Sequence, residues 1–277
     1  MWNLMNQILV HCYYVGTEYN TNLFDKTTVG KVDLLHFKEA LALRHPRFRN
    51  SDAQDADELW QEVLKPLLIE TYRTSEDPKF YQMVVHTQRV CACCGNKMNE
   101  FIRTEDSEIC VAVAPGTQDG VELQDLIATQ FAHQTNEQEC DVCGRFEIDE
   151  TRRIGECYKH LFVMMSRAVY DQQLKIISGV TEARVVVPRF ISLPNTDDQL
   201  MPLTFELRAV LVYHRSLRHY VAYAYNYYIR AWIHVDDYQI SVVQNFYKPN
   251  HDKQKANDYV QSEDCCKRGT VYIYCLQ

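Results

Sequence analysis

Residues 209–237, AVLVYHRSLRHYVAYAYNYYIRAWIHVDD, decide the fold that the sequence predicts. β-Branched and aromatic residues dominate this stretch. This composition predicts strands at 205–213, 219–228 and 231–235. A short turn at 214–218 places His219 at the start of the second strand, and the third strand runs into Asp236 and Asp237. An imidazole beside a carboxylate at neighbouring strand ends is how proteins orient a general base. The alternative is a buried histidine in an aromatic-rich hairpin, with the two acids capping a strand.

Composition limits the class of protein. The chain has 277 residues, of which 46% are apolar and 24% charged, as expected for a soluble globular protein of one large or two modest units. No apolar run approaches the roughly 18 residues that span a bilayer, so we expect no membrane partner. A net charge of −8 without a dense basic run argues against a nucleic-acid partner. The first residues do not resemble a signal peptide, so we expect a cytoplasmic or nuclear location.

The cysteines predict a metal site. An odd total of eleven, in a chain expected to stay in a reducing compartment, argues against a disulfide framework. Two CxxC pairs, Cys91 with Cys94 and Cys140 with Cys143, are each followed by glycine, which relieves strain where backbone amides turn toward sulfur. Four thiolates complete a tetrahedral structural zinc site and leave no position for water or substrate. Cys93 does not fit the spacing, and redox-active thiols remain the alternative to metal ligands.

The predicted secondary structure of the remaining segments changes from helix to strand along the chain. Residues 1–85 are expected to be mainly helical, with an amphipathic helix beginning near Ser51 or Asp52. A strand at 109–114 and a helix at 121–131 are expected between the cysteine pairs. Further strands are expected at 160–165, 185–192, 239–243 and 270–276.

Several of these stretches resemble the ubiquitin-specific proteases, the papain-like cysteine deubiquitinases. The segments HYVAYAYN and WIHVDD resemble the family's C-terminal box, QDADEL at 54–59 resembles its helix box, and TVYIYCLQ resembles its last strand. The two knuckles resemble the zinc ribbon of its ubiquitin-gripping fingers. The resemblance implies one α+β domain over 1–277, with a helical thumb (1–85), zinc-ribbon fingers (86–160) and a β-rich palm (161–277). It also implies that His219 is the catalytic base and that Asp237, with or without Asp236, orients it.

Two positions depart from the family's pattern. Its nucleophile box, aligned on Met5 and Asn6, places the catalytic cysteine at Asn3, which has no ionisable nucleophile. The nearest thiol, Cys12, lies over two helical turns further on, about 13 Å along a helix axis. The second departure is Arg218, where the family has glycine before the histidine and where a bulky cation could narrow the channel for the Gly-Gly tail of ubiquitin.

Three functions follow from these residues. The preferred hypothesis is a catalytically inactive protease-like protein that binds ubiquitin, a ubiquitin-like modifier or another protein. The alternative is an active thiol-dependent deubiquitinase whose N-terminus is mis-called or truncated, in which a cysteine from the true N-terminus attacks the isopeptide. A third class is a zinc-stabilised interaction scaffold without affinity for ubiquitin.

Overall fold

The computed structural model describes residues 42, 43, 46, 83–106, 108–157, 160–171, 176–194, 202–227, 229–236, 239–249 and 258–277. Apart from the helical Ala42 and Leu43, the helices predicted between residues 1 and 85 lie outside the described residues, as do Asn3 and Asp237. The described chain is mostly β and divides into two compact units. Among its helices, none has the length and apolar content needed to cross a membrane.

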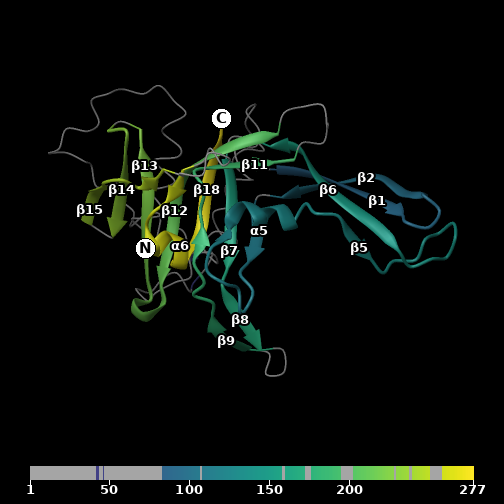
Figure 1. Ribbon diagram of the computed structural model, residues 1–277, viewed down its shortest axis with the longest axis horizontal. Coiled ribbons are helices and arrows are strands. Elements are labelled where there is room, and N and C mark those ends of the chain that lie inside the picture. The colour runs from purple at the N-terminus through teal and green to yellow at the C-terminus, as the bar shows by residue number, and fades with distance from the viewer. Residues whose placement is uncertain are drawn as a thin grey trace. The chain divides into compact units, whose positions relative to one another are not determined.

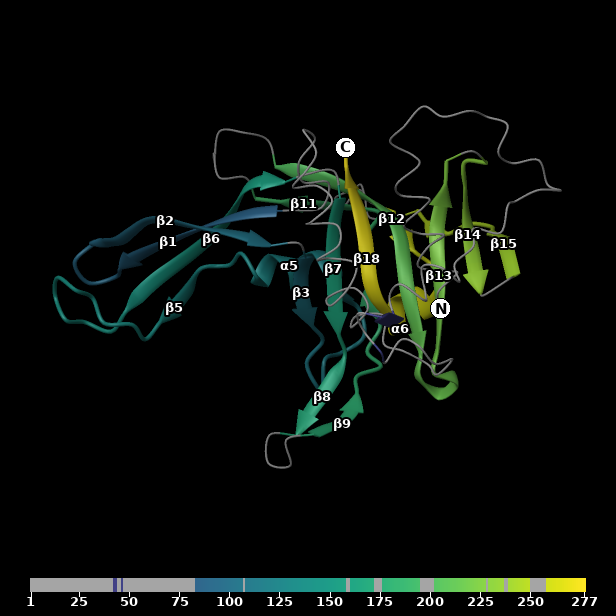
Figure 2. The ribbon, with the colours of Figure 1, turned by 180° about the vertical axis from the view of Figure 1, so that it is seen from behind.

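The larger unit, within Asp77–Val210 and Asn245–Gln277, carries a four-stranded sheet that we call the arm. In the order β2-β1-β6-β5, its strands are β2 (Lys97–Asp106), β1 (Met83–Cys91), β6 (Ile148–Cys157) and β5 (Gln134–Asn136). Figures 1 and 2 show these strands as a long projection within the unit. Antiparallel pairing of β1 with β6 places Cys91 opposite Ile148, beside the second cysteine pair. The arm therefore brings the two knuckles together, as the predicted β-ribbons require.

A second sheet of the larger unit forms its core. Its order is β12-β18-β7-β3, from β12 (Leu203–His214), β18 (Gly269–Leu276), β7 (His160–Ser166) and β3 (Glu108–Ala112), with β11 (Phe190–Leu193) also paired to β12. Strand β18 runs antiparallel to β7, and β3 runs parallel to it. The side chains of Tyr272, Tyr274 and Phe205 are fully buried there. This burial explains the continuous apolar and aromatic runs that predicted these strands.

Short elements complete the larger unit. They are β4 (Val121–Glu122), α5 (Leu123–Thr129), β8 (Ala168–Asp171), β9 (Ile176–Val180), β10 (Val185–Val186), β16 (Tyr247–Lys248), β17 (Tyr259–Val260) and α6 (Glu263–Arg268). The strand predicted at 185–192 is wrong, because the chain is interrupted around Pro188, which lacks a backbone N–H. The helix predicted at 121–131 begins later, because Val121 and Glu122 pair with β10.

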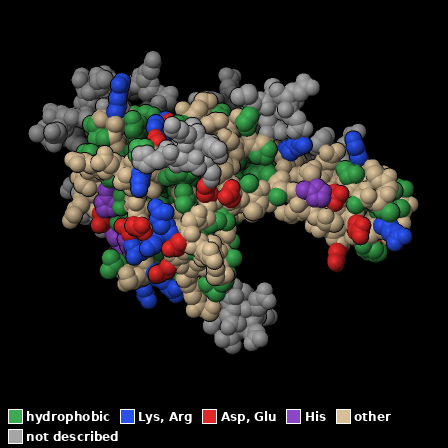
Figure 3. Space-filling view, in the orientation of Figure 1, with side chains coloured by type: hydrophobic (Ala, Val, Ile, Leu, Met, Phe, Trp, Pro, Cys, Tyr) green, Lys and Arg blue, Asp and Glu red, His purple; other side chains and the backbone are tan. Residues whose placement is uncertain are grey.

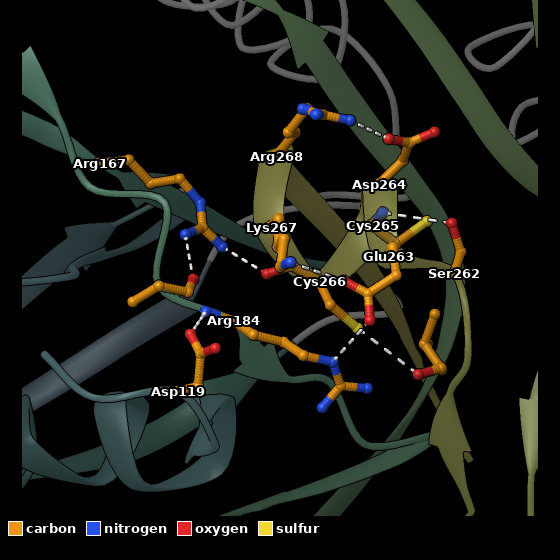
Figure 4. A network of polar contacts seen from close by, with 12 residues as sticks. Asp119, Arg167, Arg184, Ser262, Glu263, Asp264, Cys265, Cys266, Lys267 and Arg268 are labelled. Atoms are coloured by element: carbon orange, nitrogen blue, oxygen red, sulfur yellow. Dashed lines mark hydrogen bonds and ion pairs between the residues drawn. The ribbon is translucent and has the colours of Figure 1, made fainter.

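A buried arginine ties three segments of this core together (Figure 4). The Arg167 guanidinium, on a side chain only 6% exposed, donates to the carbonyl oxygens of Ala183 at 2.8 Å and Cys266 at 2.7 Å. A longer bond of 3.4 Å reaches the carbonyl of Gly269. Two of these acceptors lie at the C-terminal end of α6, where a positive charge also complements the helix dipole.

The smaller unit contains Leu211–Gln244 and its sheet follows the prediction closely. Strand β12 continues into it, a 3-10 turn (Arg215–Leu217) follows, and then come β13 (His219–Asn226), β14 (Ala231–Asp236) and β15 (Gln239–Val243). The order is β15-β14-β13-β12, with β13, β14 and β15 antiparallel in turn. The strand predicted to reach residue 228 ends at Asn226, whose side-chain oxygen accepts a bond from the Ile229 N–H in the following turn.

Candidate functional site

His219 and Asp236 meet at one end of the smaller unit's sheet. His219 opens β13 and Asp236 closes β14, and because these neighbouring strands are antiparallel, the two positions lie at the same end. The Nε2 atom of His219 lies 2.5 Å from Oδ1 of Asp236. Their side chains are 29% and 41% exposed, so the pair is accessible to a ligand. The structure therefore brings this imidazole and a following carboxylate together, and their catalytic roles stay a prediction.

The contact assigns different tasks to the two ring nitrogens. An ionised carboxylate only accepts hydrogen bonds, so Nε2 of His219 is assigned as the donor to Asp236. In the neutral ring, Nδ1 then carries the lone pair and can take a proton from a group placed against it. The geometry is that of an oriented base, which still requires a nucleophile to act upon.

The partner in the structure is Asp236, whereas the sequence favoured Asp237 as the orienting acid. Asp237 and the nucleophile position Asn3 lie outside the described residues, so their predicted roles stay predictions. Sequence reasoning also missed His234, which is two residues before Asp236 on the same strand and therefore on the same face. Its ring lies 4.8 Å from that of Tyr223, directly opposite on β13, which gives it a packing role.

The turn that leads into His219 contains an unusual backbone conformation. Arg218 has φ 48° and ψ 44°, in the left-handed region, and its N–H donates to the carbonyl of Arg215 at 3.2 Å. For a residue with a side chain this region costs roughly 1–2 kcal/mol, whereas glycine adopts it readily. This explains physically why glycine suits the position in the family that the sequence resembles. A second arginine, Arg230 in the turn between β13 and β14, has a similar φ of 50°.

The second cluster lies at the arm's end and is built from two matching knuckles. In the first, Cys91 N–H donates to the Asn96 carbonyl and Gly95 N–H donates back to the Cys91 carbonyl. In the second, Cys140 N–H donates to the carbonyl of Arg145, and the following glycine repeats the return bond. Both glycines have positive φ, 70° and 67°, as predicted from the sequence. The first cysteine of each knuckle is buried and the second is exposed.

The four sulfurs of this cluster have the spacing of a tetrahedral zinc site. Sγ of Cys91 lies 3.6 Å from Sγ of Cys143, and Sγ of Cys94 lies 3.7 Å from Sγ of Cys140. Thiolates at 2.3 Å from a zinc ion are about 3.8 Å apart along a tetrahedral edge. All four ligand atoms lie within 4.8 Å of one another, and Cys93 is not among them. The residues therefore fit the predicted ion, and a disulfide is excluded by the same distances.

Backbone amides favour the thiolate of one cysteine in this cluster. The N–H groups of Cys143 and Val142 lower the pKa of the Cys140 thiol to about 6, whereas burial and the neighbouring thiols raise the pKa values of Cys94 and Cys143. Metal-binding cysteines must be deprotonated, so Cys140 is the thiol that the backbone prepares for a cation. Around the cluster, hydrophobic side chains reach the surface of the arm (Figure 3), where Val142 is 69% and Phe146 58% exposed.

Comparison with known proteins identifies the family. The family model described as ubiquitin carboxyl-terminal hydrolase matches residues 4–274, nearly the whole chain. The chain belongs to the ubiquitin carboxyl-terminal hydrolase family. This hydrolase-family chain has the fold of the ubiquitin-specific proteases, which confirms the predicted fold class. Its division into thumb, fingers and palm at residues 85 and 160 stays a prediction. No curated protein matches the sequence.

Solved structures similar to this family member contain Ubp8. The SAGA DUB module Ubp8/Sgf11/Sus1/Sgf73 bound to monoubiquitin has a TM-score of 0.67 and 11% identity, covering 88% of this chain and 53% of that chain. The same module bound to ubiquitin aldehyde has a TM-score of 0.67 and 12% identity, covering 88% and 54%. A yeast SAGA module with an Sgf73 mutant has a TM-score of 0.60 and 12% identity, covering 81% and 51%. The hydrolase-family chain thus spans about half the length of these chains, and the likeness shows the fold alone.

Proposed function

We propose that this chain is a catalytically inactive member of its family that binds ubiquitin or a ubiquitin-like protein. The observation that carries the proposal is the pairing of His219 with Asp236, in a chain whose resemblance to the family's nucleophile box places Asn3 at the nucleophile position. Covalent acyl transfer needs an ionisable nucleophile, which an asparagine amide lacks. Losing the nucleophile of a serine protease triad costs about a million-fold in rate. An oriented imidazole alone does not restore that loss.

In this proposal, His219 and Asp236 contribute to binding. Asp236 holds the imidazole in one orientation, and the exposed ring presents Nδ1 to a bound C-terminal tail. We assign the orienting role to Asp236 because of its 2.5 Å contact. Asp237 adds negative charge next to it in the sequence.

A structural zinc ion at the arm's end is the second part of the proposal. Cys91, Cys94, Cys140 and Cys143 would hold it, and the sulfur spacing supports this assignment. When bound, the ion crosslinks two loops that are nearly fifty residues apart in the sequence. The hydrophobic cluster there is small, made of Cys91, Cys140 and Ile148 with Met98 packed against it. Such a core needs a metal to fix the loops, as in other small zinc-bound folds.

Ubiquitin is proposed as the partner because the Ubp8-containing module in two of the similar structures is bound to monoubiquitin or to ubiquitin aldehyde. The shared fold places an arm and an oriented histidine in one chain, as a ubiquitin-binding protease domain requires. Another protein partner would fit the scaffold hypothesis instead. Titration with ubiquitin and with a panel of ubiquitin-like proteins separates these two possibilities.

The decisive experiment mixes the purified chain with ubiquitin that carries a thiol-reactive electrophile at its C-terminus. Intact mass spectrometry is expected to show no adduct, in a sample that contains zinc and binds ubiquitin. The His219→Ala variant is the matched control. An adduct on one cysteine that disappears with His219→Ala would overturn the proposed inactivity.

A second candidate is an active thiol-dependent deubiquitinase. The retained pair of His219 with Asp236 favours it, because a base without a nucleophile has no catalytic use. In such an enzyme a cysteine supplied by the native N-terminus would attack the isopeptide carbonyl, and His219 would take the thiol proton and pass it to the departing lysine amine. Cleavage of a ubiquitin C-terminal amide by the protein carrying its native N-terminus, abolished by His219→Ala, would establish this function.

A further inference from the structure

The turn before His219 carries two positively charged side chains, Arg215 and Arg218. Residues 214–219 read His-Arg-Ser-Leu-Arg-His and contain no acid. Arg215 and Arg218 are both exposed, and neither forms an ion pair with the part of the chain that the structure describes. At this end of the sheet the carboxylate of Asp236 is engaged with His219, and the two exposed guanidinium groups remain available to an anion.

This turn lies at the end of the sheet where the imidazole is presented. Figure 2 shows the connection from β12 to β13 at the same end as the last residues of β14. Arg218 is bonded directly to His219, and its left-handed backbone holds the turn against the start of β13. Asp236 is engaged with Nε2 of His219, at 2.5 Å. Because Arg218 is the neighbour of His219 in the chain, a group bound at the exposed imidazole lies beside the turn that carries both arginines.

The chemistry of that group can be deduced from the charges. An isopeptide bond is neutral, and its carbonyl gains little from two guanidinium groups. A free carboxyl terminus is anionic, and its planar geometry matches the paired N–H donors of arginine. We infer that Arg218, together with Arg215, makes this site select the free C-terminal carboxylate of ubiquitin or a ubiquitin-like protein over the conjugated form. The inference rests on the proposed function and names the state of the partner that the site binds.

The same arginines would also affect product release in a hydrolase. Hydrolysis of an isopeptide produces this carboxylate, so a hydrolase must release it in every cycle. A cation one residue from the base would hold the product and slow its release. A binder of unconjugated modifier gains from the same contact, which agrees with asparagine at the nucleophile position.

The test compares ubiquitin with its natural C-terminal carboxylate and ubiquitin ending in a primary amide. We expect the wild-type chain to bind the carboxylate form about ten- to a hundredfold more tightly, as measured by isothermal titration calorimetry. Arg218→Gly and Arg218→Gln should both remove this difference. The first variant relieves the left-handed backbone, and the second keeps a long side chain without the charge.

Arg230→Gly is the matched control. Arg230 also has a positive φ, but it lies in the turn at the opposite end of β13, so its loss removes the same charge and the same backbone strain far from His219. This variant should keep the preference for the carboxylate. Equal affinity of the wild type for both ubiquitin forms would overturn the inference and leave ubiquitin binding standing. Loss of the preference with Arg230→Gly would also overturn it. If neither form binds, the inference fails together with the proposed function.

Discussion

Replacing Arg167 by methionine should destabilise the larger unit strongly. The guanidinium is buried and makes two short charge-assisted bonds, to the carbonyls of Ala183 at 2.8 Å and Cys266 at 2.7 Å. Hydrogen bonds to charged groups contribute about 1.5–3 kcal/mol each, so the loss should be about 3–6 kcal/mol. Methionine keeps most of the apolar stem but removes the guanidinium donors from both buried carbonyls.

Arg268→Met provides the control within the same element. Arg268 pairs with Asp264 one turn earlier on α6, and both side chains are substantially exposed. An exposed pair of this kind contributes about 0.3–0.5 kcal/mol. Arg167→Lys should fall between the two, because an ammonium group keeps the charge but lacks the planar fork that reaches both acceptors.

The free energy of unfolding should be measured by urea titration with circular dichroism for the wild type and these three variants. The reasoning predicts that Arg167→Met shifts the midpoint far more than Arg268→Met. If the two variants agree within about 1 kcal/mol, the buried hydrogen bonds do not carry the stability assigned to them here. If an Arg167 variant unfolds in two separate transitions, the loss of stability is confined to the larger unit.

Three further predictions concern cysteine and tyrosine side chains. Cys140→Ser should abolish bound zinc, measured by plasma mass spectrometry, whereas Cys93→Ser should keep it; loss in both would contradict the four-cysteine assignment. Iodoacetamide should modify exposed Cys93 but leave Cys266 unmodified until urea is added, because burial raises the pKa of the Cys266 thiol and shields it. Burial also raises the pKa of Tyr274, so the folded protein keeps a proton that the unfolded chain loses above about pH 10, and stability should fall as the pH rises further. Tyr274→Phe should show a shallower fall across an alkaline series of urea midpoints, and equal slopes would refute this.

The sequence predicted elements whose physical cause is local. Strand β15 was expected at its observed residues, and the observed β14 is one residue longer than the expected strand. Stretches rich in β-branched and aromatic side chains favour strands over other secondary structure. The glycine after each CxxC pair was expected to relieve backbone strain, and both glycines have positive φ in the structure. Helix α6 was missed, since its six residues carry no apolar repeat and its stability comes from packing and from Arg167.

The contact of Asp236 with His219 shows what the sequence alone left open. Neighbouring residues on a strand point to opposite faces, so a shift of one residue decides whether a carboxylate faces His219. That parity follows from the pairing of β13 with β14, which joins Ala222 to Val235, and composition does not specify it. Arg218 illustrates the opposite case, because its departure from glycine was visible in the sequence and only its backbone angle needed the structure.

The position of β18 has a consequence for how the protein is made. This strand lies between β12 and β7, although it follows both of them in the sequence. A ribosome releases the chain from its N-terminus, so both neighbours emerge and wait with an unpaired edge until residues 269–276 are synthesised. Such edges are templates for pairing with other chains. Premature termination shortly before residue 269 should therefore produce an aggregating or chaperone-bound product instead of a smaller folded domain.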